Sequence, residues 1–179
     1  MSERENSSSY SFTASRLFSS ELLCWSKSDD ISEVVLRQII RRYRNHDKNN
    51  NFHARCHYEF IQWAFCSEKI TEGIVRLLLE YFPAAVDIAD EKGWLPIHYA
   101  CDNKNVSIGI IQLLIDAAPD SVRSVNYAGL LPIHKLCGNN TELDGTEAIR
   151  ILSILLEKYP GSERIADVVG KLPFHYACL

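Results

Sequence analysis

The chain has 179 residues, of which 46% are apolar and 23% are charged, and its formal net charge is −4. These values are ordinary for a folded soluble protein, and the mild negative charge excludes the basic stripe that nucleic-acid binding requires. No window approaches the ~18 uninterrupted apolar residues of a membrane span, and the Ser-rich residues 1–12 lack the apolar core of a signal peptide. We therefore expect an intracellular protein, cytoplasmic or nuclear, with no nucleic acid and no membrane as partner, and a disordered leader over residues 1–12.

Two helix pairs are predicted in the first half of the chain. Apolar residues within 17–25 and 34–40 predict the first pair, with Asp30 or Ser32 as the N-cap of its second helix. The charged, Asn-rich run Arg41–Asn51 is predicted to be a loop.

The second pair is predicted over His57–Phe65 and Thr71–Phe82. Apolar residues of the later helix recur at the spacing of one helical face, and Thr71 is its expected N-cap. Pro83 should end that helix, because proline has no backbone N–H and restricts the residue before it.

One twelve-residue motif occurs three times, beginning at Asp90, Asn126 and Asp167. It reads Asp/Asn-x-x-Gly-x-Leu-Pro-Ile/Phe-His-x-Ala/Leu-Cys. Before each copy an apolar segment ends at a proline that lies 13 residues ahead of the proline in the motif. These helix-ending prolines are Pro83, Pro119 and Pro160. The shared offset fixes the register of a repeated unit, and recurrence at tens of residues is typical of stacked solenoids.

Each unit is predicted to contain a hairpin turn, a short first helix and a longer second helix. The glycine of the motif suits a left-handed turn, and the proline suits the first turn of a helix, where its missing N–H has no partner. The expected fold is therefore an all-α solenoid of stacked helix-turn-helix units over residues 13–179. Its parts are divergent units 13–53 and 54–88, repeats 89–124 and 125–165, and a partial repeat 166–179.

The motif resembles the opening of the ankyrin repeat, Thr-Pro-Leu-His-x-Ala, with leucine in place of threonine. The matching segments are Leu95–Ala100, Leu131–His134 and Leu172–Ala177. The units are longer than the family's ~33 residues, at 36 from Pro96 to Pro132. The resemblance implies a monomer that binds a protein partner through hairpin tips and a concave face. It also implies that the motif histidine bonds to neighbouring backbone and joins adjacent turns.

Three groups of residues in the sequence resemble metal sites in part. His98, His134 and His175 each precede a cysteine by three residues, but two ligands per repeat do not complete a zinc site. The cluster of His46, His53, Cys56 and His57 matches no zinc spacing with two cysteine pairs. The acidic stretch 140–145 begins like a calcium loop, yet its twelfth position is Ile151 rather than glutamate. We expect no metal and no cofactor, and the six cysteines are expected to be reduced packing residues.

No phosphate-binding loop, nucleophile turn or isolated carboxylate pair indicates an enzyme. The function expected is a non-catalytic protein–protein interaction module, or else an ankyrin-like fragment of a larger protein whose catalytic or signalling domain lies elsewhere. Contacts are expected at positions that differ between the copies, with Trp94 and Tyr127 as aromatic anchors unless each packs over an adjacent tip. The predicted contact residues are Glu91, Lys92, Trp94, Tyr99, Asp102, Tyr127, Leu130, Lys135, Val169 and Lys171. Residues 140–145, inserted between the two helices of one unit, are a further candidate for recognition.

Overall fold

The computed structural model describes residues 20–28, 32–44, 58–139 and 144–178. Within these ranges the regular elements are all helical, as the sequence predicts, and no helix there is both long and apolar enough to cross a membrane. After a helix of residues 20–27 come α2 (Glu33–Arg44), α3 (Tyr58–Cys66), α4 (Glu72–Tyr81), α5 (Pro96–Asp102), α6 (Ile108–Ala117), α7 (Pro132–Gly138), α8 (Gly145–Lys158) and α9 (Pro173–Ala177). Short 3-10 helices occupy Pro83–Asp87, Pro119–Arg123 and Ser162–Arg164.

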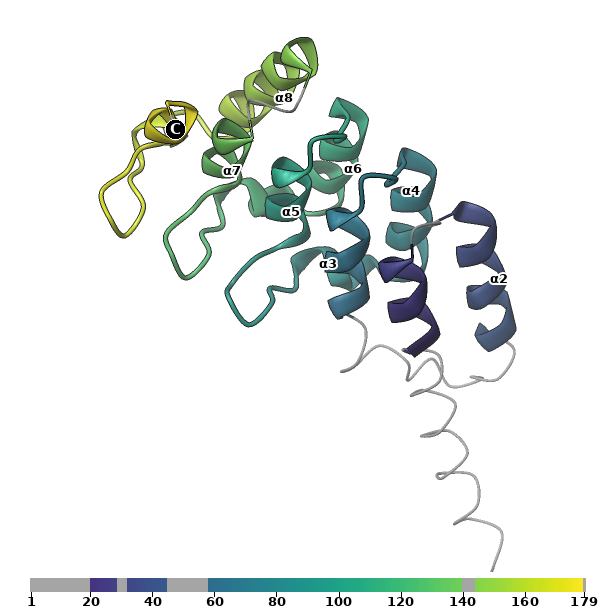
Figure 1. The fold of residues 1–179 in the computed structure, drawn as a ribbon. Helices are drawn as coiled ribbons and strands as arrows, with labels where there is room; N and C mark the ends of the chain where they lie inside the picture. The colour runs from purple at the N-terminus through teal and green to yellow at the C-terminus, as the bar shows by residue number, and fades with distance from the viewer. Residues whose placement is uncertain (1–19, 29–31, 45–57, 140–143, 179) are drawn as a thin grey trace, which may run out of the picture.

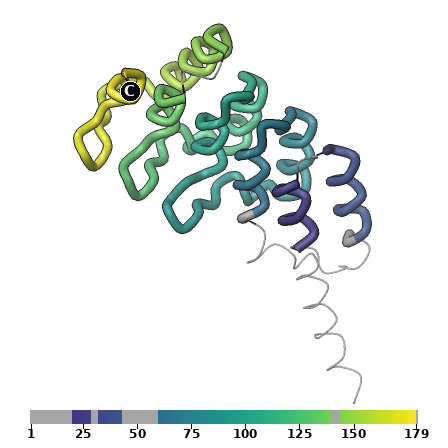
Figure 2. Tube along the Cα trace, viewed as in Figure 1, coloured from purple at the N-terminus to yellow at the C-terminus, as the bar shows by residue number. Residues whose placement is uncertain are grey.

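The helices form two rows (Figure 1). In one row α3 contacts α5, α5 contacts α7, and α7 contacts α9. In the other row α2 contacts α4, α4 contacts α6, and α6 contacts α8. Hairpin loops before α5, α7 and α9 project side by side from the first row (Figure 2). Each unit therefore packs on its neighbours in sequence, and the hairpins share one side of the molecule.

The ends of the helices follow the predicted prolines. Helices α5, α7 and α9 begin at the proline of the motif. Pro83 and Pro119 each follow the C-terminal cap of a helix and begin a 3-10 helix. These 3-10 helices were not predicted from the sequence. Thr71 caps α4 as predicted, by accepting a hydrogen bond from the Ile74 N–H at 3.3 Å. Asp144 caps α8 in the same way through Glu147, which gives this acidic residue a structural role.

The predicted loop Arg41–Asn51 was wrong over its first four residues, because α2 continues to Arg44. Nothing in that segment breaks a helix, and the Arg42 guanidinium pairs with the Glu21 carboxylate at 2.9 Å. The pair joins the last turns of α2 to the helix of residues 20–27. Ser32, one of the two predicted N-cap residues, contacts the start of α2, since its hydroxyl accepts from the Val35 N–H at 3.3 Å; the other, Asp30, lies outside the described residues.

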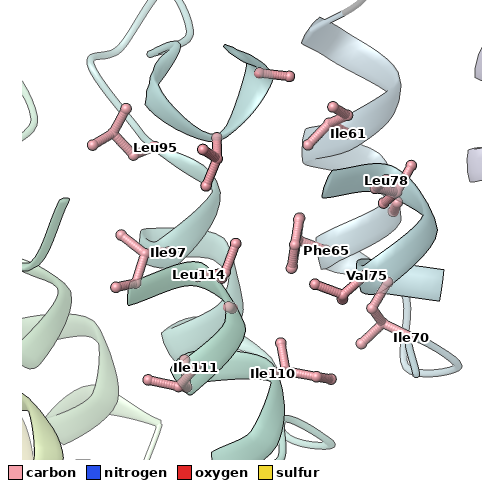
Figure 3. Packing of buried hydrophobic residues seen from close by; sticks show 14 of the residues in the cluster. Ile61, Phe65, Ile70, Val75, Leu78, Leu95, Ile97, Ile110, Ile111 and Leu114 are labelled. Atoms are coloured by element: carbon pink, nitrogen blue, oxygen red, sulfur yellow. The ribbon is translucent and has the colours of Figure 1, made fainter. Parts of the chain in front are cut away.

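One apolar core runs between the two rows. Phe65 of α3 and Leu78 of α4 lie close to Leu114 of α6, all of them buried (Figure 3). The second-row helices thus bury their apolar face against the first row and against the next unit. Truncating a leucine at such a site costs about 2–5 kcal/mol of stability. Because this core packs each unit on the next, it also sets the spacing of the hairpins.

Candidate interaction surface

Three hairpin turns carry the residues predicted to make contacts. We name them the first (90–94), second (126–130) and third (167–171) hairpins. In the first, the Asp90 N–H donates to the Trp94 carbonyl at 3.0 Å, and the Asp90 carboxylate accepts from the backbone N–H of Lys92 and of Trp94. Gly93 has a φ of 79°, which an L side chain rarely adopts. The acidic or amide residue and the glycine of the motif therefore build the turn.

Neighbouring hairpins are joined by backbone hydrogen bonds. The Tyr127 N–H donates to the Lys92 carbonyl at 3.0 Å, and the Val168 N–H donates to the Ala128 carbonyl at 3.1 Å. The two bonds occupy equivalent positions in successive units. They place the three tips in one row (Figure 2).

His98 joins the first hairpin to the second, in the role that the resemblance implied. Its Nδ1 atom accepts from the Leu95 N–H at 3.0 Å, and its Nε2 atom lies 3.1 Å from the Leu130 carbonyl. A carbonyl can only accept, so the proton must be on Nε2 and the imidazole must be neutral. Burial lowers the pKa of His98 and favours the same neutral form.

His134 occupies the equivalent place one unit later. Its Nδ1 atom accepts from the Leu131 N–H at 3.0 Å. Its Nε2 atom makes no hydrogen bond of ordinary geometry. Burial lowers the pKa of His134, and this effect is larger than the opposite one of the Lys171 backbone, which holds the position equivalent to Leu130. In the parts of the chain that the structure describes, no three His, Cys, Asp or Glu side chains gather as a metal site would require; the cluster at 46–57 lies outside them.

Tyrosines of the first helices close the first and third hairpins onto their own helix. The Tyr99 hydroxyl donates to Asp90 at 2.6 Å, and the Tyr176 hydroxyl donates to Asp167 at 2.5 Å. The bond to Asp167, with burial, raises the pKa of Tyr176 to about 12. Burial alone would raise the pKa of Asp90, but its hydrogen bonds from Tyr99 and from the backbone lower it.

The second unit differs, because Lys135 stands where the other copies have tyrosine. Its ammonium reaches back to the preceding unit, where it pairs with Asp102 at 2.9 Å and lies 4.8 Å from the centre of the Trp94 ring. The Trp94 ring in turn packs 5.1 Å from the ring of Tyr99. The structure therefore brings four predicted contact residues into one group. Trp94 is half-buried in this group. Its position therefore fits the predicted alternative, an aromatic ring packed on its neighbours, better than it fits an exposed anchor for a partner.

The other predicted residues lie at the tips and along their bases. Tyr127 is 77% exposed and Val169 is 77% exposed, and both Glu91 and Lys92 are exposed as well. The Tyr127 ring lies against Gly93 of the first hairpin while most of it faces solvent. Leu130 and Lys171 are half-buried, with the Lys171 ammonium 5.5 Å from the Tyr176 ring. We call Glu91, Lys92, Tyr127, Val168 and Val169 the tip surface.

Val168 and Phe174, both apolar and exposed, were not among the predicted contacts. Val168, at the third tip, is 71% exposed, and Phe174, on α9, is 72% exposed. Phe174 occupies the motif position of Ile97 and Ile133, which are buried. At both positions the third copy differs from the two earlier ones, and that difference is the signal that the sequence offers. The insertion candidate at 140–145 falls mostly outside the described residues.

No known family model matches this sequence, and no curated protein was found to match it. Function must therefore be inferred from the contacts and exposures described above.

Proposed function

We propose that this chain is a non-catalytic protein-interaction module, an ankyrin-like solenoid that binds a protein partner through its tip surface and the adjoining face of the first helices. Each of the helices α3, α5 and α7 contacts the next helix of the first row, and the first two hairpins each bond to the hairpin that follows. Such one-dimensional stacking is what gives solenoids an extended surface for recognition.

The observation that carries the proposal is that the repeated and the variable positions of the motif have different roles. Its repeated letters are occupied with the fold: Asp90 templates the turn, Gly93 permits it, and His98 bonds to the next hairpin. The letters that vary between copies include the most exposed ones, such as Tyr127. Variation and exposure coincide at the tips, as expected when the scaffold serves folding and the tips serve contact.

The chemistry of this face suits a protein rather than a small molecule. The group of Trp94, Tyr99, Asp102 and Lys135 combines aromatic rings with a paired charge, and the tips beside it become more apolar from Lys92 to Val169. An apolar centre with a polar border is the usual composition of a protein–protein interface. Six of the motif's polar groups, the Asp or Asn and the His of each copy, are committed to turns and caps, which supports a binding role over a catalytic one.

An intracellular location is part of the same proposal. Cys101 is fully buried, and burial raises the pKa of its thiol. All five cysteines in the described part of the chain are free thiols. Reduced thiols are the usual state in the cytosol and nucleus.

Quantitative affinity capture tests the proposal. The bait would be the full chain, with Tyr127→Ala as the probe variant and Ile149→Ala, an exposed apolar position on α8, as the matched control. We expect one protein to be retained stoichiometrically, to lose about thirtyfold in affinity with Tyr127→Ala, the ~2 kcal/mol of an interface hot spot, and to be unaffected by Ile149→Ala. Equal affinities for the wild type and the tip variant, with loss at α8, would place the binding surface on the second row instead.

A further inference from the structure

The group around Trp94 contains a cation held between aromatic rings and a carboxylate. The Lys135 ammonium lies 4.8 Å from the centre of the Trp94 ring and 2.9 Å from an Asp102 oxygen. The Trp94 and Tyr99 rings are 5.1 Å apart and tilted by 41°. A ring face and a carboxylate both attract positive charge. We call Trp94, Tyr99 and Asp102 the cation site, because the chain's own lysine shows that a cation fits there.

The charge around the cation site is negative apart from its lysines. The Tyr99 hydroxyl donates to Asp90 at 2.6 Å, which places a second carboxylate beside that ring. Burial raises the pKa of Tyr99 most, and the charges of Asp90 and Asp102 raise it further. Two carboxylates therefore act on the same ring, and their charge favours a cation at the site.

The cation site is specific to the first copy of the motif. The equivalent positions hold Leu130, Lys135 and Gly138 in the second copy and Lys171, Tyr176 and Leu179 in the third. Only the first copy combines two aromatic rings with a carboxylate. Residues that build the hairpin and its helix, such as Gly93 and His98, recur in all three copies. The cation site does not recur, which favours a role in recognition over a role in folding.

Lys135 is an occupant that can be replaced. The Asp102 side chain is 44% exposed and the Lys135 side chain 22%, so the pair borders solvent and has the modest strength of a partly exposed ion pair. A lysine ammonium is also a compact, strongly hydrated charge. A guanidinium is more weakly hydrated, stacks flat on an aromatic ring, and pairs with both oxygens of a carboxylate. An arginine therefore gains more from the cation site than Lys135 loses on returning to solvent.

We infer that the cation site binds an arginine side chain of the protein partner, and that Lys135 occupies the site until this arginine displaces it. The inference rests on the proposed function, because Tyr99 and Asp102 belong to α5, on the face that adjoins the tip surface. The arginine stacks on the Trp94 ring and pairs with Asp102. The released Lys135 ammonium is then free to pair with a carboxylate of the same partner. The partner segment is thus a polypeptide with an exposed arginine.

The test titrates the isotope-labelled full chain with N-acetylarginine amide and follows the indole N–H signals by nuclear magnetic resonance. Trp94→Phe identifies the signal of Trp94, and Trp25 and Trp63 serve as internal references. Lys135→Ala empties the cation site and should raise the affinity about fivefold to tenfold, the combined effect of a cation–π contact and an ion pair. Lys135→Arg fills the site with the stronger occupant and should lower the affinity about threefold below that of the wild type.

The matched control is Lys104→Ala. Lys104 also forms an ion pair, with Glu68 at 2.6 Å, so the substitution makes the same change in net charge. It should leave the affinity for the arginine probe unchanged. N-acetylcitrulline amide, a neutral molecule of similar shape, should not bind, and Asp102→Asn should remove the gain that Lys135→Ala gives. Because both side chains of the pair border solvent, every variant should keep the far-ultraviolet circular dichroism spectrum of the wild type.

Equal affinities of the wild type, Lys135→Ala and Lys135→Arg for the arginine probe would overturn the inference. Tighter binding of N-acetyllysine amide would overturn it too. Shifts of equal size at Trp63, whose ring has the Lys27 ammonium at 4.6 Å, would show unspecific cation binding and have the same consequence. A captured partner that is lost with Tyr127→Ala but is held equally by the wild type and by Lys135→Arg would support the proposed function and overturn this inference.

Discussion

The first hairpin with α5 and the third hairpin with α9 are built from the same motif and differ in what contacts them. In the junction between the first two hairpins His98 is fully buried and bonds to two backbone groups, while on α9 His175 is exposed and bonds to one. The capping bond through Nδ1 is present in both places. The contribution of a motif residue therefore has a local part, made within its own unit, and a part that exists only when another unit follows.

The largest effect is expected when the motif histidine is removed from a junction. His98→Ala would leave a cavity and would strip the Leu95 N–H and the Leu130 carbonyl of their partner, which should cost about 3 kcal/mol. His175→Ala removes only a cap at the exposed end and should cost below about 1 kcal/mol. Urea denaturation followed by circular dichroism measures both; equal losses would mean that the bond to the next hairpin contributes nothing.

The glycines of the hairpins offer a second test of the same difference. Gly129 and Gly170 have φ angles of 76° and 85°, so alanine at either position is strained by about 1 kcal/mol. At Gly129 the added methyl would also lie 2.9 Å from the backbone of the third hairpin. We expect Gly129→Ala to lose about 2–3 kcal/mol and Gly170→Ala about 1 kcal/mol. A Gly170→Ala loss as large as that of Gly129→Ala would show that the close approach of the third hairpin to Gly129 adds no cost.

Stability should also depend on pH through the buried histidines. Burial holds the pKa of His98 and of His134 below the ordinary value of 6.5, even though nearby Asp90 and Asp167 favour the charged form. The unfolded chain therefore takes up protons that the folded chain does not once the pH falls below about 6.5. The unfolding free energy should be constant above about pH 7.5 and should drop by up to ~1 kcal/mol per histidine by about pH 5.5.

The matched variant for this pH dependence is His98→Gln, which removes one of the two groups. Its overall stability will be lower, but the slope of stability against pH should be about half that of the wild type. A wild-type stability that does not change between about pH 5.5 and 7.5 would show that the folded histidines titrate normally. Further loss is expected only below about pH 4, as Asp90 and Asp167, whose pKa values are lowered, become protonated.

Much of the helical framework could be predicted because its signals are local. Pro96 marks a helix start, Pro83 marks a helix end, and Thr71 is a cap whatever the rest of the chain does. The end of α2 could not be placed in the same way. Arg41–Arg44 resembles a solvated loop in composition, but α2 continues through it, and its Arg42 pairs with Glu21, a contact that lies far away in sequence.

The exposure of some predicted contact residues could be anticipated from the sequence, but their arrangement could not. Variation between the copies identified Tyr127 and Val169, which are indeed exposed. It could not show that Trp94 would lie beneath Lys135, because that contact depends on a lysine in the next unit reaching back across the junction. Exposure follows from neighbours in space, and a repeat spacing gives only neighbours along the chain.

The smallest expected effect comes from giving the second unit the pair that the first unit has. Asn126 and Lys135 stand where the first copy has Asp90 and Tyr99, whose 2.6 Å bond closes the hairpin onto its helix. Lys135→Tyr alone loses the ion pair with Asp102, a partly exposed contact of about 0.5 kcal/mol. Asn126→Asp alone introduces a carboxylate, but position 135 then has no tyrosine hydroxyl to donate a hydrogen bond to it.

The double variant should recover what the single variants lose, because the new phenol can donate to the new carboxylate. A double-mutant cycle measured by urea denaturation should give a favourable coupling of about 0.5–1 kcal/mol between the two positions. A coupling of zero would mean that the pairing of Asp90 with Tyr99 and of Asn126 with Lys135 is incidental. A favourable coupling would show that each copy closes its hairpin in one of two ways. In the second unit, Lys135 would then contact Trp94 and Asp102 of the preceding unit, and no hydrogen bond like that of Tyr99 would close the second hairpin onto its own helix.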